Sequence, residues 1–299
     1  QSSRPDLLPA ALIRLRQPNG AMHLEPDPAA CVSVCRLRHG DLDVLRPTPS
    51  RTGSDYDARD YAAFPMLPFV GRIHQGRFRQ GGRSIELPAN MPPEPHAIHG
   101  HGWQNCWRVE TQTQSSATLT FEYEAGDWPW SYEATQSFIL LDDGIDLTMR
   151  VRNLGDSAMP CGIGWHPYFE RSGATLMLDT VSIWSSEAST GQIQAHPVRA
   201  NDDLSQGRSV EALDLDTTFT IGSPRTRVTW PTHDVILQAD PVFMGSTVYV
   251  PPAETYFCVE PVSMIPNAFN SALADDQTGL KRIEPGESLE GKISLRVVR

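Results

Sequence analysis

Hydrophobic and polar residues alternate along much of the chain, and this pattern predicts β-strands. Residues 117–125 and 286–299 alternate in the way expected of strands with one buried face. Residues 134–153 read as two strands around Asp142-Asp143-Gly144, which is a hairpin signal. Similar strand patterns occupy residues 174–184, 226–240 and 246–260. The pattern therefore favours a β-rich fold.

The segments between these strands are rich in turn-forming residues. The chain has 25 Pro and 22 Gly, which would interrupt long helices too often. Residues 7–15 give a hint of a helix, which Pro9 weakens. No repeat, low-complexity tract or linker stands out. We expect an all-β fold, a large antiparallel β-sandwich, in a single domain over residues 1–299.

Composition narrows the classes of partner. The 299 residues are 39% hydrophobic, which is enough for a sizeable core. The formal net charge is -11, from 36 acidic and 25 basic residues, and the pI is about 5.2. This balance argues against nucleic acid and anionic membranes as partners and favours a neutral or weakly charged small molecule. No apolar run reaches the roughly 20 residues of a membrane span.

Cysteine usage and the N-terminal residues predict a cytoplasmic location. The cysteines are scattered, odd in number and contain no CxxC, as expected of reduced thiols rather than a disulfide framework. They are Cys31, Cys35, Cys106, Cys161 and Cys258. The first ten residues contain no apolar core of a signal peptide, although a chain whose signal had been removed would look the same.

Two titratable residues stand in unusual apolar surroundings. His166 lies in the aromatic stretch GIGWHPYFE, residues 162–170, where an imidazole needs a partner to offset desolvation. Glu260 ends an apolar strand and precedes Pro261. Each has an ordinary alternative: His166 as a core histidine and Glu260 as a carboxylate emerging into solvent. A carboxylate buried at this place would indicate a function.

A second group of candidates lies between residues 64 and 107. His99 and His101 are two residues apart, so on a strand they would share one face and could bind a metal. A carboxylate ligand is missing nearby, and Gly100 and Gly102 indicate a loop that lets backbone and imidazoles approach a ligand. Surface histidines near a turn are the alternative. Arg72 follows an apolar, Pro-interrupted stretch and has the alternative of a surface position on a strand edge.

The aromatic residues near these candidates are consistent with a sugar ligand. The seven Trp include Trp103, Trp107, Trp128, Trp130 and Trp165. Sugar rings pack their C–H faces on aromatic planes and leave hydroxyls for Arg, His and carboxylates. Core packing explains an individual Trp equally well.

A series of motifs in these segments resembles the aldose 1-epimerase (galactose mutarotase-like) family. In chain order they are LRPTP, GRI at residues 71–73, IHGHGW, WPWSYEATQSFIL, IDLTMRVRN, WHPYF, DTTF, CVEP and IEPGES. Each motif alone is weak, whereas the series in family order covers most of the chain. The resemblance implies a large antiparallel β-sandwich and an isomerase that needs no cofactor or metal.

The resemblance also implies roles for individual residues. His166 would be the general acid and Glu260 the general base. Arg72 and His99 would hold sugar hydroxyls and the region of the ring oxygen, Asp216 would bond hydroxyls farther round the ring, and His101 would be a second contact. The aromatic residues Trp165, Tyr168 and Phe169 would form walls that position His166 beside the sugar.

These roles describe a carbohydrate-metabolism enzyme that opens and closes a sugar ring. The base removes the C1 hydroxyl proton while the acid protonates the ring oxygen, and the roles reverse on closure. An ionised Glu and a protonated His suit this chemistry at neutral pH.

The substrate and the function class stay open at this point. The HGHGW segment differs from the longer His-Gly-Gly pattern of galactose enzymes, so the sugar is not fixed. A hexose-6-phosphate 1-epimerase would need a basic cluster such as Arg77, Arg79 and Arg83. A non-catalytic sugar-binding protein on the same fold and a metal-dependent β-sandwich enzyme are two further possibilities. The oligomeric state and the pathway stay open as well.

Overall fold

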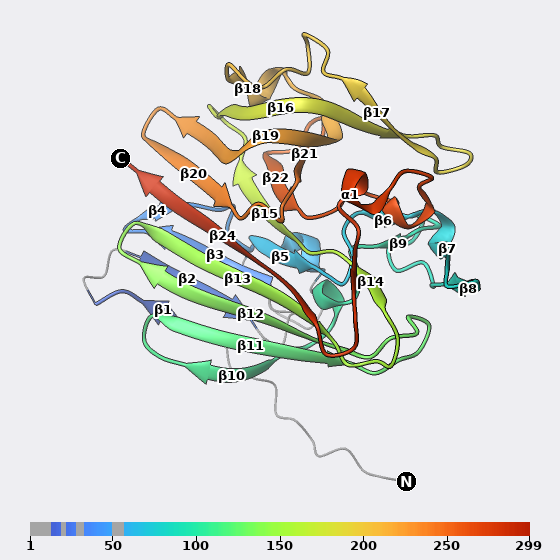
Figure 1. The fold of residues 1–299 in the computed structure, drawn as a ribbon. Coiled ribbons are helices and arrows are strands. Elements are labelled where there is room, and N and C mark those ends of the chain that lie inside the picture. The colour runs from blue at the N-terminus through green and yellow to red at the C-terminus, as the bar shows by residue number, and fades with distance from the viewer. Residues whose placement is uncertain (1–12, 19–21, 28–32, 50–56) are drawn as a thin grey trace.

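A computed structural model describes residues 13–18, 22–27, 33–49 and 57–299. Within these ranges the fold is built from antiparallel strands, as predicted (Figure 1). The short helical segments are η2 (Ala58–Asp60), η3 (His74–Gly76), η4 (Gly102–Gln104), η5 (Val210–Ala212), η6 (Ala268–Asn270) and α1 (Asp275–Thr278). The helix hinted at by residues 7–15 falls mostly outside the described residues, and Leu15 belongs to a strand.

One run of paired strands forms the first half of a sandwich. Its strands pair in the order β10, β11, β12, β13, β24 and β20. Their bounds are Arg108–Gln112, Ser116–Tyr123, Tyr132–Leu141, Gly144–Asn153, Ser288–Val298 and His233–Ala239. The predicted hairpin over residues 134–153 is present as β12 and β13, which pair from Tyr132↔Asn153 to Leu141↔Gly144.

The second half follows through the long strand β19 (Leu215–Trp230). Residues 225–230 of β19 pair with β20, and residues 215–220 pair with β21. From there the order is β21, β22, β15, β5, β3 and β2. Their bounds are Gly245–Val250, Tyr256–Val262, Gly164–Glu170, Ala63–Met66, Ser33–His39 and Met22–Asp27. β19 therefore joins the two halves.

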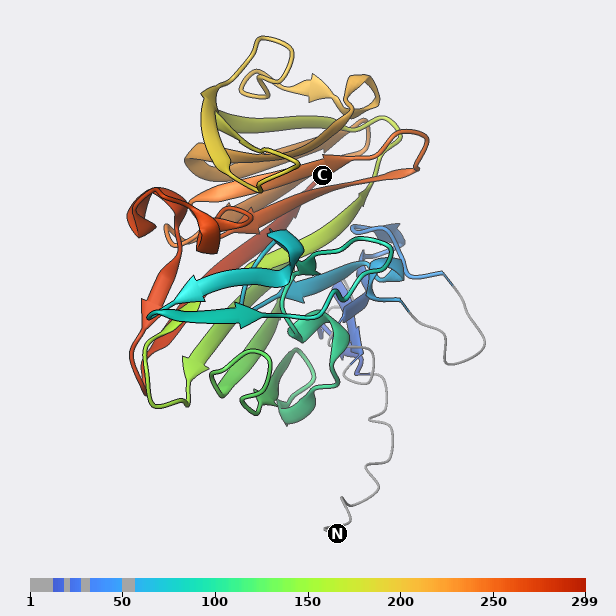
Figure 2. The same cartoon turned by 90° about the vertical axis from the view of Figure 1, so that its right-hand side faces the viewer.

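Further strands pair with the members of these runs. β1 (Leu15–Arg16) pairs with β2, β4 (Leu42–Asp43) with β3, and β16 (Thr175–Ser186) with β19, β17 (Ile193–Pro197) and β18 (Arg208–Ser209). Three two-stranded pairs lie apart: β6 (Arg72–Ile73) with β9 (Ala97–Ile98), β7 (Arg77–Gln80) with β8 (Arg83–Glu86), and β14 (Met159–Cys161) with β23 (Lys281–Ile283). Figure 2 shows the β7–β8 hairpin (cyan) close to the η6 segment (red), where Asn270 Nδ2 donates to the Arg77 carbonyl at 2.8 Å.

Side-chain alternation builds the core between the two halves. In β13, Ile145, Leu147, Met149 and Val151 are almost completely buried, and the polar residues between them are partly exposed. The two halves meet where β12 contacts β2. The same alternation in β15 sends its two faces to different surroundings, which decides how the site is built.

Candidate active site

A row of side chains crosses five neighbouring strands and forms the floor of a cavity. Thr218 pairs with Thr247, and Thr247 pairs with Glu260. The register of β15 and β22, from Gly164↔Val262 to Tyr168↔Cys258, places His166 opposite Glu260, and His166 also pairs with Phe64 of β5. Residues opposite each other in antiparallel strands share one face of the sheet, so the strand register is sufficient to bring these side chains next to one another.

The centre of this row is a buried pair of titratable groups. His166 Nε2 lies 3.2 Å from Glu260 Oε1, and both side chains are almost fully buried. The Phe64 ring stacks on the His166 ring at a centroid distance of 4.3 Å, which fixes the plane of the imidazole. This separation is within reach of a proton transfer between the two groups.

Burial favours the uncharged form of both partners. Burial, with a smaller contribution from the positive charge of Arg46, lowers the pKa of His166 to about 3. Burial and the negative charge of Asp216 raise the pKa of Glu260 well above its ordinary value, and Arg72 opposes that rise. An ionised Glu260 beside a protonated His166 is therefore disfavoured by burial, unlike the sequence-based expectation. These pKa directions favour a neutral imidazole beside a protonated carboxyl.

His99 enters the cavity from a strained loop. Its backbone φ is 59°, a left-handed value that a β-carbon disfavours. The Gly71 N–H donates to His99 Nδ1 at 3.2 Å, and the His99 N–H donates to the Gly71 carbonyl at 2.9 Å. Burial holds the pKa of His99 well below its ordinary value, so the ring is neutral. Because Nδ1 accepts, the proton sits on Nε2, which is a hydrogen-bond donor.

Glycines around His99 explain why this loop can adopt its shape. Gly100 has a φ of 70°, and a β-carbon there would lie 2.0 Å from the Leu67 carbonyl oxygen. Gly71 has a φ of 63°, and a β-carbon there would meet the Pro266 ring at 2.7 Å. The predicted loop is thus present, and Gly100 lets the backbone approach Leu67 closely. Gly71, which exchanges hydrogen bonds with His99, allows a similar close approach to Pro266.

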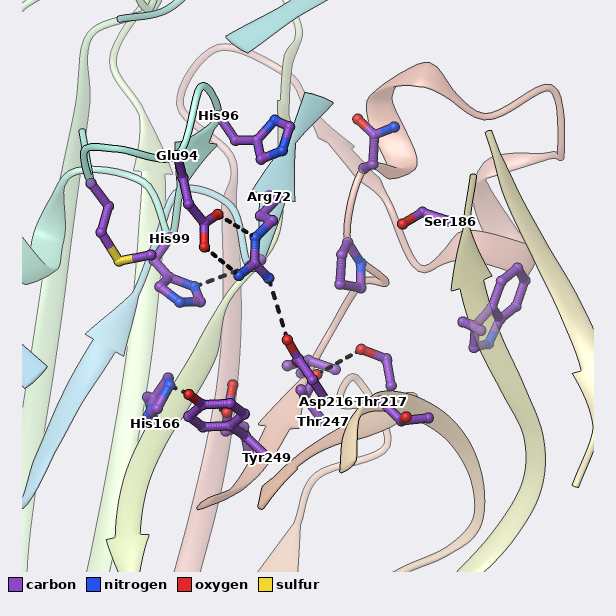
Figure 3. Close-up of a pocket in the computed structure, with 18 of the residues that line it drawn as sticks. Arg72, Glu94, His96, His99, His166, Ser186, Asp216, Thr217, Thr247 and Tyr249 are labelled. Carbon is purple, nitrogen blue, oxygen red and sulfur yellow. Dashed lines mark hydrogen bonds and ion pairs between the residues drawn. The ribbon is translucent and has the colours of Figure 1, made fainter. Parts of the chain in front are cut away.

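An arginine held by two carboxylates forms one wall of the cavity. Arg72 donates to both carboxylate oxygens of Glu94, from Nε at 2.7 Å and Nη2 at 2.9 Å. Its Nη1 lies 3.8 Å from Asp216 Oδ2 (Figure 3). The bond to Arg72 lowers the pKa of Glu94, and the bond to Glu94 raises the pKa of Arg72. Arg72 and Glu94 are therefore both charged, and Arg72 and Asp216 stay about half exposed toward the cavity.

Together these groups surround a cavity of about 650 Å³. This volume lies within the roughly 300–1,000 Å³ typical of small-molecule sites. The predicted residues Arg72, His99, His166, Asp216 and Glu260 all line it, as does Tyr168. Figure 3 shows Arg72 and His99 on one side and Asp216, Thr217, Thr247 and Tyr249 on the other, with His166 at the inner end.

Two predicted site residues lie elsewhere. His101 does not line the cavity; its ring stacks on Tyr123 at 4.2 Å, and its Nδ1 lies 2.8 Å from the Tyr132 hydroxyl. Trp165 is buried in the core, because it alternates with His166 and Tyr168 along β15 and faces the opposite side. Phe169 faces that side too, so of the three expected aromatic walls only Tyr168 reaches the cavity.

The arginines considered for a phosphate site lie outside the cavity as well. Arg77, Arg79 and Arg83 belong to the β7–β8 hairpin and do not line the cavity. Arg77 is engaged by Glu86, with Nη2 2.8 Å from Oε1. No basic cluster from this hairpin faces the site.

The histidine pair considered for a metal does not form, but another donor set does. His99 points into the cavity, whereas His101 joins an aromatic cluster. One ligand atom each from the buried residues His166, Cys258 and Glu260 lie within 4.8 Å of one another, and His166 and Glu260 of this set line the cavity. Nitrogen, sulfur and carboxylate oxygen are donors that zinc accepts.

Several lining residues were not identified from the sequence. Glu94 sits in the Pro-rich segment MPPEPH, where nothing marks a carboxylate as the partner of an arginine 22 residues earlier. Phe64 was also missed; it stacks at 5.3 Å on Trp103, which the sequence had pointed out, behind His99 and His166. Tyr249 could have been found, since it stands two residues after Thr247 in an alternating strand and shares its face.

The chain matches known proteins along most of its length. The sequence model of the aldose 1-epimerase family matches residues 30–296. Two curated proteins of Escherichia coli strain K12 are similar: the uncharacterized protein YphB, 27% identical over 80% of this chain and 85% of its own, and the uncharacterized protein YihR, 27% identical over 70% and 71%.

Solved structures show the same fold. A crystal structure from Escherichia coli K12, of a protein provisionally named an aldose 1-epimerase, has a TM-score of 0.84 and 25% identity, covering 96% of this chain and 98% of the other. A galactose 1-epimerase from Lactobacillus acidophilus NCFM has a TM-score of 0.77 and 16% identity, covering 99% and 96%. A galactose mutarotase-like protein from Clostridium acetobutylicum has 0.81 and 18%, covering 93% of each chain. The β-sandwich is therefore of the galactose mutarotase-like type.

Proposed function

Since the chain belongs to the aldose 1-epimerase family, we propose that it interconverts the α and β anomers of a free aldose by general acid–base ring opening and closure. One observation carries the proposal: His166 Nε2 and Glu260 Oε1 lie 3.2 Å apart at the floor of a cavity. The two sugar oxygens that exchange protons, O1 and O5, are both bonded to C1. An acid and a base that serve them must therefore both lie close to C1, and neighbouring groups at the cavity floor meet this requirement.

The proposed reaction uses the pair twice. Glu260 removes the proton from O1, the C1–O5 bond breaks as C1=O1 forms, and His166 gives a proton to O5. Rotation about C1–C2 then turns the other face of the carbonyl toward O5. On closure Glu260 returns a proton to O1 and His166 takes one from O5, so the enzyme ends in its starting state.

The single shared proton suits a reversible reaction. Burial disfavours both charges, so the pair is neutral before sugar binds, with the proton on Glu260. Transfer of that proton to His166 Nε2 across 3.2 Å gives the form in which Glu260 is the base and His166 the acid. The polar oxygens of a bound sugar replace part of the lost hydration and favour this transfer.

The wall of the cavity supplies donors and acceptors for sugar hydroxyls. His99 Nε2–H and Arg72 donate, Asp216 accepts, and the Tyr249 hydroxyl does either. Glu94 touches Arg72 rather than the open cavity floor, so it is a positioning residue that holds the guanidinium in place.

The charge balance of the lining favours a free sugar over its phosphate. The guanidinium of Arg72 is engaged by Glu94, and that of Arg59 by Asp57 at 2.5 Å. The Arg77–Arg83 hairpin lies outside the cavity. A phosphate would therefore enter a site whose arginines are already paired and would meet the carboxylate of Asp216.

Exchange spectroscopy by NMR tests the proposal directly. Anomer exchange is measured over a panel of free aldoses and their 6-phosphates, with the spontaneous rate subtracted. We expect at least one free aldose to exchange faster with the protein, and with a higher kcat/KM than its phosphate. A panel in which no aldose exchanges faster than with folded Glu260→Gln protein would leave only a sugar-binding role.

A further inference from the structure

A buried thiol that the proposed reaction does not use lies beside the cavity floor. Cys258 precedes Glu260 by two residues in β22, so both side chains project to the same face of the strand. Its sulfur, His166 Nε2 or Nδ1 and a Glu260 oxygen lie within 4.8 Å of one another, and all three residues are buried. His166 and Glu260 line the cavity, which gives an ion a route to the cluster.

The donor set and its spacing fit a zinc ion. Zinc is held by Cys sulfur at about 2.3 Å and by His nitrogen or carboxylate oxygen at about 2.0–2.2 Å, so neighbouring ligands lie about 3.5 Å apart on a tetrahedral ion. The His166–Glu260 contact is already 3.2 Å, and the largest separation within the cluster is 4.8 Å. Small side-chain movements would bring the three ligands onto one ion, with its fourth position open to the cavity.

The surroundings of His166 do not support a permanently bound cofactor. Metal-ligating histidines almost always donate their second ring nitrogen to a partner that fixes the ring. His166 Nδ1 is buried and has no such partner in the part of the chain that the structure describes. The cluster therefore lacks the outer support of a resident metal centre, while its ligand atoms are those that the proposed proton transfers need.

We propose that His166, Cys258 and Glu260 form an inhibitory site for Zn²⁺ that blocks the acid–base pair at the cavity floor. The inhibitory consequence rests on the proposed function, whereas binding of the ion does not. Zinc and sugar exclude each other, because the ion occupies the atoms that face O1 and O5. Metal-free protein is the active form, so exhaustive chelation leaves activity intact.

Cobalt absorption tests the binding without any assay of activity. Co²⁺ is titrated into metal-free protein, and a thiolate-to-cobalt charge-transfer band with tetrahedral visible bands is expected at one ion per chain. Cys258→Ser removes the charge-transfer band. Cys258→Ala serves as a second variant, and circular dichroism checks that each is folded. Cys106→Ser and Cys161→Ser are controls that keep the band.

Zinc inhibition tests the consequence. Zn²⁺ should abolish the epimerase activity of the wild type, and EDTA should restore it. Losing an outer-shell partner typically costs about 10- to 100-fold in metal affinity, so loss of the thiolate should raise the inhibitory zinc concentration by about 100-fold or more. An active protein with no cobalt band, or a band that survives in Cys258→Ser, overturns the metal site. A Cys258-dependent band on a protein without epimerase activity supports the site and overturns the proposed function instead.

Discussion

The cavity contains two glutamates in opposite environments, Glu260 on the floor and Glu94 on the wall. Glu260 is buried on a central strand with His166 as its close neighbour, and burial raises its pKa. Glu94 lies about one-third exposed on a loop and binds Arg72 through both oxygens, which lowers its pKa. The same side chain is therefore biased toward its protonated form in one place and its ionised form in the other.

This contrast indicates that Glu260 takes part in the chemical step, whereas Glu94 orients Arg72. A carboxyl that holds a proton and can release it is suited to acid–base work. A carboxylate fixed by an arginine is suited to holding that arginine still. We therefore expect changes at the floor to lower kcat and changes at the wall to act mainly on KM.

Removing either member of the floor pair should have the largest effect. Glu260→Gln keeps the shape and removes the base, and His166→Asn removes the acid. General acid–base groups contribute roughly 100- to 10,000-fold, so each variant should lose about 100-fold or more in kcat. Because both groups serve one transition state, the double variant should lose less than the product of the single losses.

The control for these variants is a histidine outside the cavity. His233→Asn changes a residue of β20 that stacks on Trp230 and should keep full activity. Polarimetry with subtraction of spontaneous mutarotation gives the rates, and circular dichroism checks the fold. Near-normal kcat in a folded His166 or Glu260 variant would remove that residue from the mechanism.

A change at the wall should have a smaller effect of a different kind. Glu94→Gln keeps the size but replaces one acceptor oxygen with an amide that faces the Arg72 donors. Hydrogen bonds to charged groups are worth about 1.5–3 kcal/mol, so we expect kcat/KM to fall about tenfold, mostly through KM. Glu86→Gln is a matched control, since Glu86 binds Arg77 at 2.8 Å away from the cavity. An equal fall in kcat would place Glu94 in the chemistry instead.

His99 and His101 offer a comparison at closer range. His99→Asn removes a donor from the cavity and should raise KM several-fold. His101→Phe keeps the stacking on Tyr123 but leaves the Tyr132 hydroxyl without its partner, so it should cost about 1–3 kcal/mol of unfolding free energy and leave KM unchanged. Urea denaturation and kinetics on both variants decide this. A raised KM in His101→Phe would return His101 to the site.

The sequence was sufficient for the fold and for most of the floor, because both depend on local patterns. Alternation with a period of two predicts the strands, and motifs on those strands identify His166, Asp216 and Glu260. The same alternation shows why Trp165 faces the core, although the family motif grouped it with the site. A motif records which residues occur together, whereas the strand decides which way each one points.

The contacts of the wall could not be predicted from the sequence, because loop geometry builds them, although Arg72 and His99 were predicted as site residues. The ion pair of Arg72 and Glu94 depends on a segment whose path follows from the pairing of β6 with β9 and from left-handed residues such as His99. His99 and His101 separate for the same reason: the Gly100 region turns the chain between them. The charge states of His166 and Glu260 could not be predicted from the sequence either, since their pKa values depend on burial that no local pattern reveals.

The smallest effect concerns stability, and the two glutamates should show it with opposite signs. The pKa of Glu94 is lowered on folding, so its stabilisation is present above its ordinary pKa and is lost as the pH falls through the lowered value. The pKa of Glu260 is raised on folding, so its contribution is present below its ordinary pKa and is lost as the pH rises through the raised value. Urea unfolding across a pH series should therefore show that the advantage of wild type over Glu94→Gln shrinks toward acid, and that wild type loses stability relative to Glu260→Gln as the pH rises. The Glu94 difference should stay below about 1 kcal/mol, because the pair is partly exposed, and the Glu260 difference should change by about 1.4 kcal/mol for each unit of its pKa shift. If both differences changed in the same direction with pH, the floor and the wall would not be the opposite environments that their burial and contacts indicate.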